Sequence, residues 1–132
     1  MRIQESAENY LETILMLGKA KGNVRSIDIA TALSFSKPSV SVAMKNLREN
    51  GYILMDKDGF IALTEKGHEI AETIYERHTL LSSFLMYLGV SKETATQDAC
   101  RIEHVISPES FEALKQHVYS HKEIMDIKDV KI

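Results

Sequence analysis

Two short β-prone runs flank an Asp-Gly pair near the middle of the chain. Residues 52–55 read Tyr-Ile-Leu-Met, residues 60–63 read Phe-Ile-Ala-Leu, and Asp58-Gly59 lies between them. This arrangement is a strong signal for a two-stranded hairpin, because aspartate and glycine tolerate the positive backbone angles of a tight turn. Elsewhere the apolar residues recur at helical spacing. The chain is therefore predicted to be mainly α, with one hairpin.

Three helices are expected before the hairpin, over residues 4–20, 27–33 and roughly 37–50. Ser26 is predicted to cap the second helix, and a turn of about three residues follows it. Ser36 is expected to cap the third helix, with Pro38 in its first turn, where a missing N–H is harmless. Gly51 is suited to end that helix.

The second half of the chain is predicted to be entirely helical. Thr64 and Ser91 are expected to cap helices, Gly89 and Ser107-Pro108 are expected to break them, and the predicted helices cover 65–88, 91–106 and 108–120. A helix-turn-helix followed directly by a hairpin is the winged-helix plan. The expected domains are a winged helix-turn-helix over 1–64, a helical domain over 65–120 and a weakly ordered tail over 121–132.

Composition favours an ordinary globular protein of the cytoplasm. The 132 residues are 44% hydrophobic and 27% charged, which is typical of globular domains. No apolar run approaches the roughly 20 residues of a membrane span, so no membrane partner is expected. The first residues lack the plan of a secretory signal. A single cysteine excludes an internal disulfide and fits a reducing compartment.

The charge is unevenly distributed. The formal net charge is −3, whereas DNA-binding domains tend to be basic. Residues 20–66 nevertheless carry seven Lys and Arg against five acidic residues. The remainder of the chain carries nine basic residues against fourteen acidic ones. A near-neutral first portion joined to an acidic remainder suits a DNA reader coupled to a cation sensor, and it also suits many other proteins.

The third predicted helix has the outward face of a DNA-reading helix. Its apolar positions, such as Val40 and Met44, lie on one side, and the other side carries short polar and basic residues that can enter the major groove. Basic residues nearby could contact phosphates. Val42 departs from the pattern and offers only apolar contact. The predicted DNA-contacting residues are Arg25, Ser36, Lys37, Pro38, Ser39, Ser41, Val42, Lys45, Arg48 and Lys57. The alternative is a helical bundle used only for protein contacts.

A thiol, a carboxylate and an imidazole are spaced for one helical face near the end of the chain. Cys100, Glu103 and His104 stand at i, i+3 and i+4. Sulfur, oxygen and nitrogen ligands together suit a first-row divalent ion better than magnesium or calcium. By spacing alone, a buried cysteine with ordinary neighbours is an equally good reading.

Further donors lie on two other predicted helices. His78 could supply a second imidazole, although its position on an apolar stripe also fits a core histidine. Asn9 and Glu12 are spaced i, i+3 on the first helix and could approach as oxygen donors, although Glu12 alone reads as a solvated residue.

Four segments resemble, in order, the diphtheria toxin repressor and manganese transport regulator family. They are SAENYLETI at 6–14, KPSVSVAMKNLRENGYI at 37–53, RHTLLSSFL at 77–85 and DACRIEHVIS at 98–107. The resemblance runs from about residue 5 to 120 and matches short members that lack an SH3-like domain. It implies that the helical domain dimerises, that a metal site lies at the domain junction, and that a homodimer represses metal-uptake genes through a palindromic operator in double-stranded DNA.

Carried over position by position, the resemblance implies a hybrid metal site. His78, Cys100, Glu103 and His104 stand at positions resembling the family's ligands. Cys100 resembles the iron type, whereas Glu12 matches an additional carboxylate of the manganese type. Asn9 stands where iron-responsive members have Met and manganese-responsive members have Asp.

The implied cofactor is Fe²⁺ or Mn²⁺, with no organic cofactor. The Cys100 thiol gives Fe²⁺ a slight advantage, because manganese prefers oxygen and imidazole ligands. An ancillary ion site is only partly present, because Ser82 and Thr96 stand where a carboxylate and an imidazole are expected.

Two other function classes stay open at this point. One is a winged-helix regulator that senses a small organic ligand, with its cysteine and histidines structural. The other is a metalloenzyme, which we do not expect, because the chain offers no evident base, nucleophile or Gly-rich cofactor loop beyond the proposed ligands.

Overall fold

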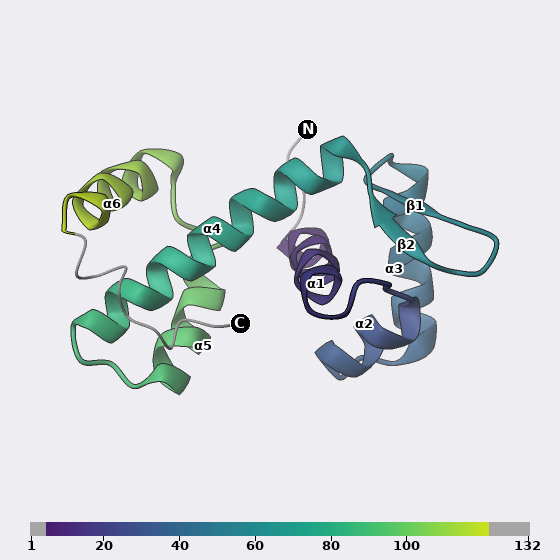
Figure 1. Cartoon of the computed structure of the whole chain (residues 1–132), viewed down its shortest axis with the longest axis horizontal. Coiled ribbons are helices and arrows are strands. Elements are labelled where there is room, and N and C mark those ends of the chain that lie inside the picture. The colour runs from purple at the N-terminus through teal and green to yellow at the C-terminus, as the bar shows by residue number, and fades with distance from the viewer. Residues whose placement is uncertain (1–4, 122–132) are drawn as a thin grey trace. The chain divides into compact units, whose positions relative to one another are not determined.

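The computed structural model describes residues 5–121. The described part of the chain holds six helices and one antiparallel pair of strands (Figure 1): α1 (Glu5–Lys21), α2 (Ser26–Leu33), α3 (Lys37–Glu49), β1 (Ile53–Met55), β2 (Ile61–Leu63), α4 (Glu65–Tyr87), α5 (Lys92–Ile102) and α6 (Pro108–Ser120). This confirms the mainly helical winged-helix prediction. None of the described helices is long and apolar enough to cross a membrane. The tail predicted over 121–132 lies outside the described residues except for its first residue, His121.

The chain divides into two compact units within α4, between Thr73 and Ile74. The first unit contains the helix-turn-helix and the hairpin. The second contains the remainder of α4 with α5 and α6, which lie beside it in Figure 1. Its core is built from Leu80, Phe111 and Val118, with Phe84, Ile106 and Leu114 packed against them.

The helix-turn-helix forms as the sequence predicts. Ser34 takes a left-handed conformation with φ 58°, which ends α2 and redirects the chain. Ser36 caps α3 by accepting a hydrogen bond from the Ser39 amide at 3.3 Å. Val40 and Met44 are buried on the inner side of α3. Burial of these apolar residues fixes which side of α3 remains exposed to solvent.

The hairpin is joined to the rest of its unit by one extra pairing. β1 and β2 pair with Ile53 opposite Leu63 and Met55 opposite Ile61. In addition, the Ile61 amide donates to the Val24 carbonyl at 2.7 Å, so the segment before α2 forms a bridge to β2. The sequence did not indicate this bridge, because Val24 is a single apolar residue in a polar turn.

The predicted cap of α2 is wrong by one residue. Ser26 is already helical, and Arg25 occupies the capping position with extended backbone angles. The Asp28 carboxylate reaches back and accepts the Arg25 amide at 2.9 Å, and it also accepts the Lys21 ammonium at 2.6 Å. This carboxylate satisfies an otherwise unpaired amide at the helix start and therefore moves the start of the helix.

Asp28 is expected to make the stability of the chain pH-dependent. The hydrogen bond from Lys21, and then that from the Arg25 amide, hold the pKa of this carboxyl below its usual value. Its stabilising effect is therefore present above the unfolded pKa, about 3.9, and is lost as the pH falls through the lower folded pKa. Asp28→Asn should lower the midpoint of urea unfolding near neutral pH, and the difference from wild type should narrow in acid. An equal difference at every pH would contradict this assignment.

The helix predicted over 91–106 is also shorter than expected. Ser91 caps α5 as predicted, accepting the Thr94 amide at 3.3 Å, but the helix ends at Ile102. Pro108 has no N–H to continue the helix and disfavours helical angles at the residue before it, so Ser107 is extended with ψ 154°. Residues 103–106 consequently form a turn between α5 and α6.

Candidate metal centre and nucleic-acid interface

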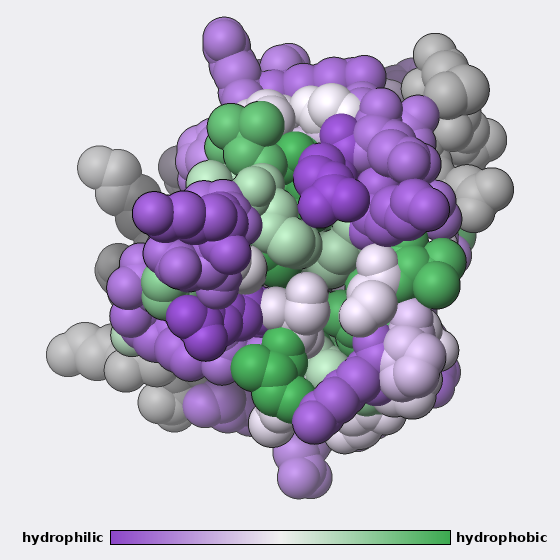
Figure 2. Space-filling view, turned by 90° about the vertical axis from the view of Figure 1, so that its right-hand side faces the viewer, coloured by the Kyte–Doolittle hydropathy of each residue, from purple (hydrophilic) through white to green (hydrophobic). Residues whose placement is uncertain are grey.

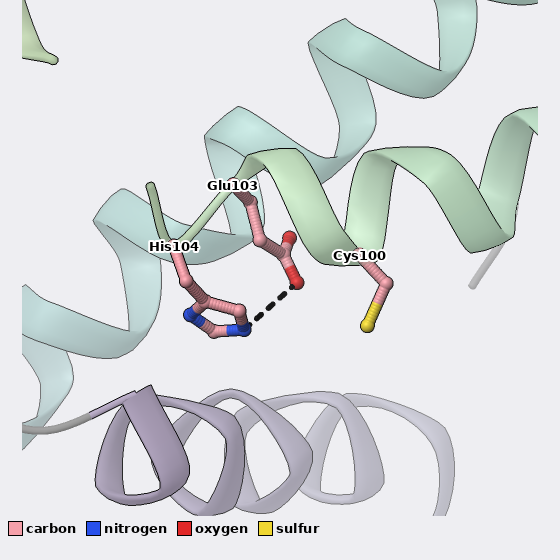
Figure 3. Close-up of side chains that lie close together, drawn as sticks. All are labelled: Cys100, Glu103 and His104. Atoms are coloured by element: carbon pink, nitrogen blue, oxygen red, sulfur yellow. Dashed lines mark ion pairs between the residues drawn. The ribbon is translucent and has the colours of Figure 1, made fainter. Parts of the chain in front are cut away.

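The Cys100, Glu103 and His104 side chains gather at the C-terminal end of α5. One ligand atom from each lies within 4.8 Å of the others, and Figure 3 shows the three projecting from the same side of the chain. Glu103 and His104 stand in the turn after the helix rather than on it. The Glu103 amide still bonds to the Ala99 carbonyl at 2.9 Å, so the backbone keeps helical geometry for one more residue. The three side chains therefore lie close together, as their spacing predicts, although the helix has ended.

His78 on α4 adds a second imidazole beside Glu103. Its Nδ1 lies 3.2 Å from Glu103 Oε2, and His104 Nε2 lies 3.5 Å from Glu103 Oε1. The Glu103 side chain is fully buried, and the two imidazoles are 6% and 3% exposed. One buried carboxylate therefore has an imidazole beside each of its oxygens.

The unsatisfied atoms of this cluster fit a cation. Both Glu103 carboxylate oxygens and His78 Nδ1 are buried and make no hydrogen bond. A buried carboxylate that accepts no hydrogen bond is costly, and such groups are normally paired or bound to metals. Imidazole, carboxylate and thiol donors together are those of a first-row divalent ion. The residues present therefore fit the metal that the sequence indicates.

The other two predicted ligands belong to the first unit. Asn9 and Glu12 lie on α1, three residues apart and hence on neighbouring positions of one helical face. The main-chain carbonyl of Asn9 accepts the Thr13 hydroxyl at 2.8 Å. Their part in the metal site stays a prediction.

Sequence reasoning missed Arg77, the neighbour of His78. Its Nη1 donates hydrogen bonds to the carbonyls of Glu103 and Ile106, at 3.1 and 3.2 Å. A basic residue beside a predicted cation site gives no positive signal in a sequence. Only the fold shows which backbone carbonyls it contacts.

All the side chains predicted to contact DNA are exposed. They come from α3, its preceding turn, the hairpin tip and the segment before α2, and they are Arg25, Ser36, Lys37, Pro38, Ser39, Ser41, Val42, Lys45, Arg48 and Lys57. Figure 2 looks onto the side of the first unit that carries α3 and the hairpin. Hydrophilic residues cover most of this face, and the hydrophobic ones form a few separate patches. Such a surface is open to a polar partner.

Several of these residues already have intramolecular contacts. The Ser36 hydroxyl bonds to the Ser39 hydroxyl at 2.8 Å as well as capping α3. The Arg25 guanidinium lies over the Phe60 ring at 4.3 Å. Arg48 approaches the Met55 sulfur at 3.9 Å. Ser36 therefore acts first as a structural cap, whereas Lys45 and the 61% exposed Val42 project from the middle of α3.

Comparison with known proteins gives two family matches that together span nearly the whole chain. Residues 2–61 match the N-terminal DNA binding domain of iron dependent repressors. Residues 64–124 match the metal binding and dimerisation domain of iron dependent repressors.

Individual relatives agree with these matches. The transcriptional regulator MntR of Escherichia coli O157:H7 is 35% identical over 118 residues, covering 89% of this chain and 76% of the relative. The HTH-type transcriptional regulator MntR of Bacillus subtilis (strain 168) is 35% identical over 127 residues, covering 96% of this chain and 89% of the relative.

The solved structure of the manganese regulator SloR matches with a TM-score of 0.75 and 30% identity over 90% of this chain. The chain spans only 55% of that structure's length. The relatives are transcriptional regulators rather than enzymes. The chain thus belongs to the iron dependent repressor family, in which a DNA-binding domain precedes a metal-binding and dimerisation domain.

Proposed function

We propose that this protein is a metal-dependent transcriptional repressor of iron or manganese homeostasis genes, which binds a palindromic operator as a homodimer when loaded with Fe²⁺ or Mn²⁺. The observation that carries the proposal is the fully buried Glu103 carboxylate, which has no hydrogen bond and faces His78 and His104. A regulator that senses an organic molecule would have no need of the buried Glu103 carboxylate. The functional boundary falls near residue 64, between the DNA-reading and the metal-binding portions, and the protein acts in the cytoplasm.

The metal site of this proposal uses residues from both parts of the chain. His78, Cys100, Glu103 and His104 hold the ion, and Asn9 and Glu12 complete its shell. A bound divalent ion supplies the positive charge that the buried carboxylate lacks. Because the ligands come from α1 as well as from α4 and the end of α5, binding favours one arrangement of the DNA-reading domain.

The features of the chain that bear on the preferred metal favour two different ions. The Cys100 thiol favours Fe²⁺, because thiolate is a soft ligand, whereas Glu12 and the likeness to SloR, named as a manganese regulator, favour Mn²⁺. Equilibrium dialysis against each ion, followed by a metal-loaded crystal structure with anomalous scattering at the iron and manganese edges, distinguishes them. Density for the ion away from Glu103 would contradict the assigned site.

DNA recognition is assigned to α3 in the major groove and to the hairpin beside it. The α3 N-terminus presents backbone amides, and Lys37, Lys45 and Lys57 supply positive charge for phosphates. Val42 is suited to contact a thymine methyl group. Selection of bound duplexes from a random library, in the presence of Mn²⁺, should return a sequence with two inverted half-sites about one helical turn apart.

Lys45→Ala is expected to weaken binding to every duplex by a similar factor. If Lys45 contacts a phosphate, the slope of log K against log salt should fall in magnitude by about 1. Fluorescence anisotropy at several salt concentrations measures both quantities. Lys92→Ala, an exposed lysine at the start of α5, is the matched control and should leave the slope unchanged. Equal slopes in Lys45→Ala and wild type would remove Lys45 from the interface.

Dimerisation is assigned to the second unit. Large hydrophobic side chains are exposed there, namely those of Tyr87, Leu88, Val105 and Tyr119, at 47 to 71% of their surface. Exposed apolar groups of this size mark protein contact surfaces when they gather together. Sedimentation equilibrium should give twice the 14.9 kDa chain mass. A monomer at micromolar concentration would contradict the dimer.

A further inference from the structure

We propose that Arg77 is a positioning residue of the metal centre, which fixes the peptide group joining Glu103 to His104. This inference rests on the proposed metal-binding function. Arg77 donates its hydrogen bonds to main-chain carbonyls. It acts through the backbone of the turn that carries two of the ligands.

The contact geometry supports this role directly. Arg77 Nη1 donates to the Glu103 carbonyl at 3.1 Å and to the Ile106 carbonyl at 3.2 Å. The Glu103 carbonyl belongs to the peptide group between the two ligand residues. Its orientation sets the direction in which each Cα–Cβ bond leaves the backbone, and hence where the carboxylate and the imidazole meet.

The turn needs such support because α5 ends just before it. The last carbonyls of a helix have no partner within the helix and must find one elsewhere. Glu103 and His104 follow Ile102, the last residue of α5, so helical hydrogen bonds do not hold their carbonyls. A guanidinium is suited to this place, since it bonds two acceptors at once and its positive charge interacts favourably with the C-terminal end of a helix.

Arg77 is itself held in place by the core of the second unit. Its guanidinium carbon lies 5.4 Å from the centre of the Phe111 ring. Phe111 is 5% exposed and packs with Leu80 and Val118. The turn is thereby tied to a packed core rather than to a side chain free in solvent, which limits how far the ligands can drift in the absence of metal.

Two adjacent residues of α4 therefore act on one ligand. His78 faces the Glu103 carboxylate at 3.2 Å, and Arg77 bonds to its main-chain carbonyl. Groups that orient metal ligands in this way typically contribute about 10- to 100-fold to metal affinity. The charge of Arg77 has the opposite effect, because a nearby cation repels the metal ion. A loss of affinity on removing Arg77 would therefore have to come from lost positioning.

The test compares Arg77→Met and Arg77→Lys with wild type in the full-length protein. Arg101→Met is the matched control, since it removes the same charge from an exposed position in the last turn of α5. Mn²⁺ dissociation constants are measured by titration, and thermal unfolding of each metal-free variant is measured separately. The visible spectrum of the Co²⁺-loaded protein reports on ligand geometry, which a purely structural role of Arg77 would leave unchanged.

Arg77→Met is expected to bind Mn²⁺ about 10- to 100-fold more weakly and to change the Co²⁺ spectrum. Arg77→Lys should lie between Arg77→Met and wild type, and Arg101→Met should match wild type. Affinity within twofold of wild type and an unchanged spectrum would overturn the inference. If Arg77→Met does not fold, the same criterion applies to Arg77→Lys, because lysine lacks the planar guanidinium group. If wild type binds no metal, the proposed function fails.

Discussion

Glu103→Gln is expected to weaken Mn²⁺ and Fe²⁺ binding by at least about 100-fold, more than the loss of a residue that only orients a ligand. The carboxylate is fully buried, and both of its oxygens are without hydrogen bonds. Glutamine preserves the shape of the side chain but removes the charge and replaces one oxygen by an amide NH2 group, whose nitrogen does not bind a cation. Isothermal titration of the metal-free protein measures the change.

The control for this substitution is Glu109→Gln at the exposed start of α6, which should bind metal as wild type does. Far-UV circular dichroism shows whether Glu103→Gln keeps its helices. Wild-type affinity in a folded Glu103→Gln protein would show that the ion binds elsewhere, and the assignment of the site would then be wrong.

Gly67→Ala is expected to destabilise the winged-helix unit by about 2 kcal/mol or more, because overpacking of this kind usually costs about 1–3 kcal/mol. A Cβ at Gly67 would overlap the carbonyl oxygen of Tyr52, which is backbone and not the end of a flexible side chain. That carbonyl also accepts the Thr64 amide at 3.1 Å, so it cannot move away without breaking the bond at the end of the hairpin. Thermal unfolding should show a decrease in Tm of roughly 8–16 °C.

Gly18→Ala is the matched control within the same unit. Gly18 lies inside α1, and no atom is within 4 Å of the position its Cβ would take. This substitution should stabilise the chain by about 0.5–1 kcal/mol, because glycine is unfavourable inside a helix. Equal stability of Gly67→Ala and wild type would mean that α4 and the Tyr52 carbonyl are farther apart than described.

The features that could be predicted from sequence depend on short-range chemistry. The caps at Ser36, Thr64 and Ser91 bond to amides three residues ahead, so a few neighbouring residues are enough to reveal them. The cap at Ser26 was wrong because the carboxylate of Asp28 competes for the same helix start. The predicted end of α5, at residue 106, is too late: the helix ends at Ile102, whereas Pro108 restricts only the backbone of Ser107 directly before it.

The proximity of three candidate metal ligands was predictable for the same reason. The spacing of Cys100, Glu103 and His104 is local, and the three side chains still lie close together after the end of the helix because the Glu103 amide bonds as in a helix. His78 and Glu103 are 25 positions apart in the sequence. The sequence pattern alone therefore does not distinguish a metal-binding His78 from a core histidine, and only the family resemblance implies the metal-binding role. Only the fold shows that His78 contacts the Glu103 carboxylate and that Arg77 bonds to the Glu103 carbonyl.

The most direct test of the metal-dependent switch is the affinity for the selected operator duplex with and without metal. Fluorescence anisotropy at one fixed salt concentration would be recorded with Mn²⁺ or Fe²⁺ present and again after chelation. The metal-loaded protein is expected to bind about 10- to 100-fold more tightly, in the range typical of coupling between two sites. Equal affinity before and after chelation, in a protein shown to bind the ion, would contradict a metal-dependent switch.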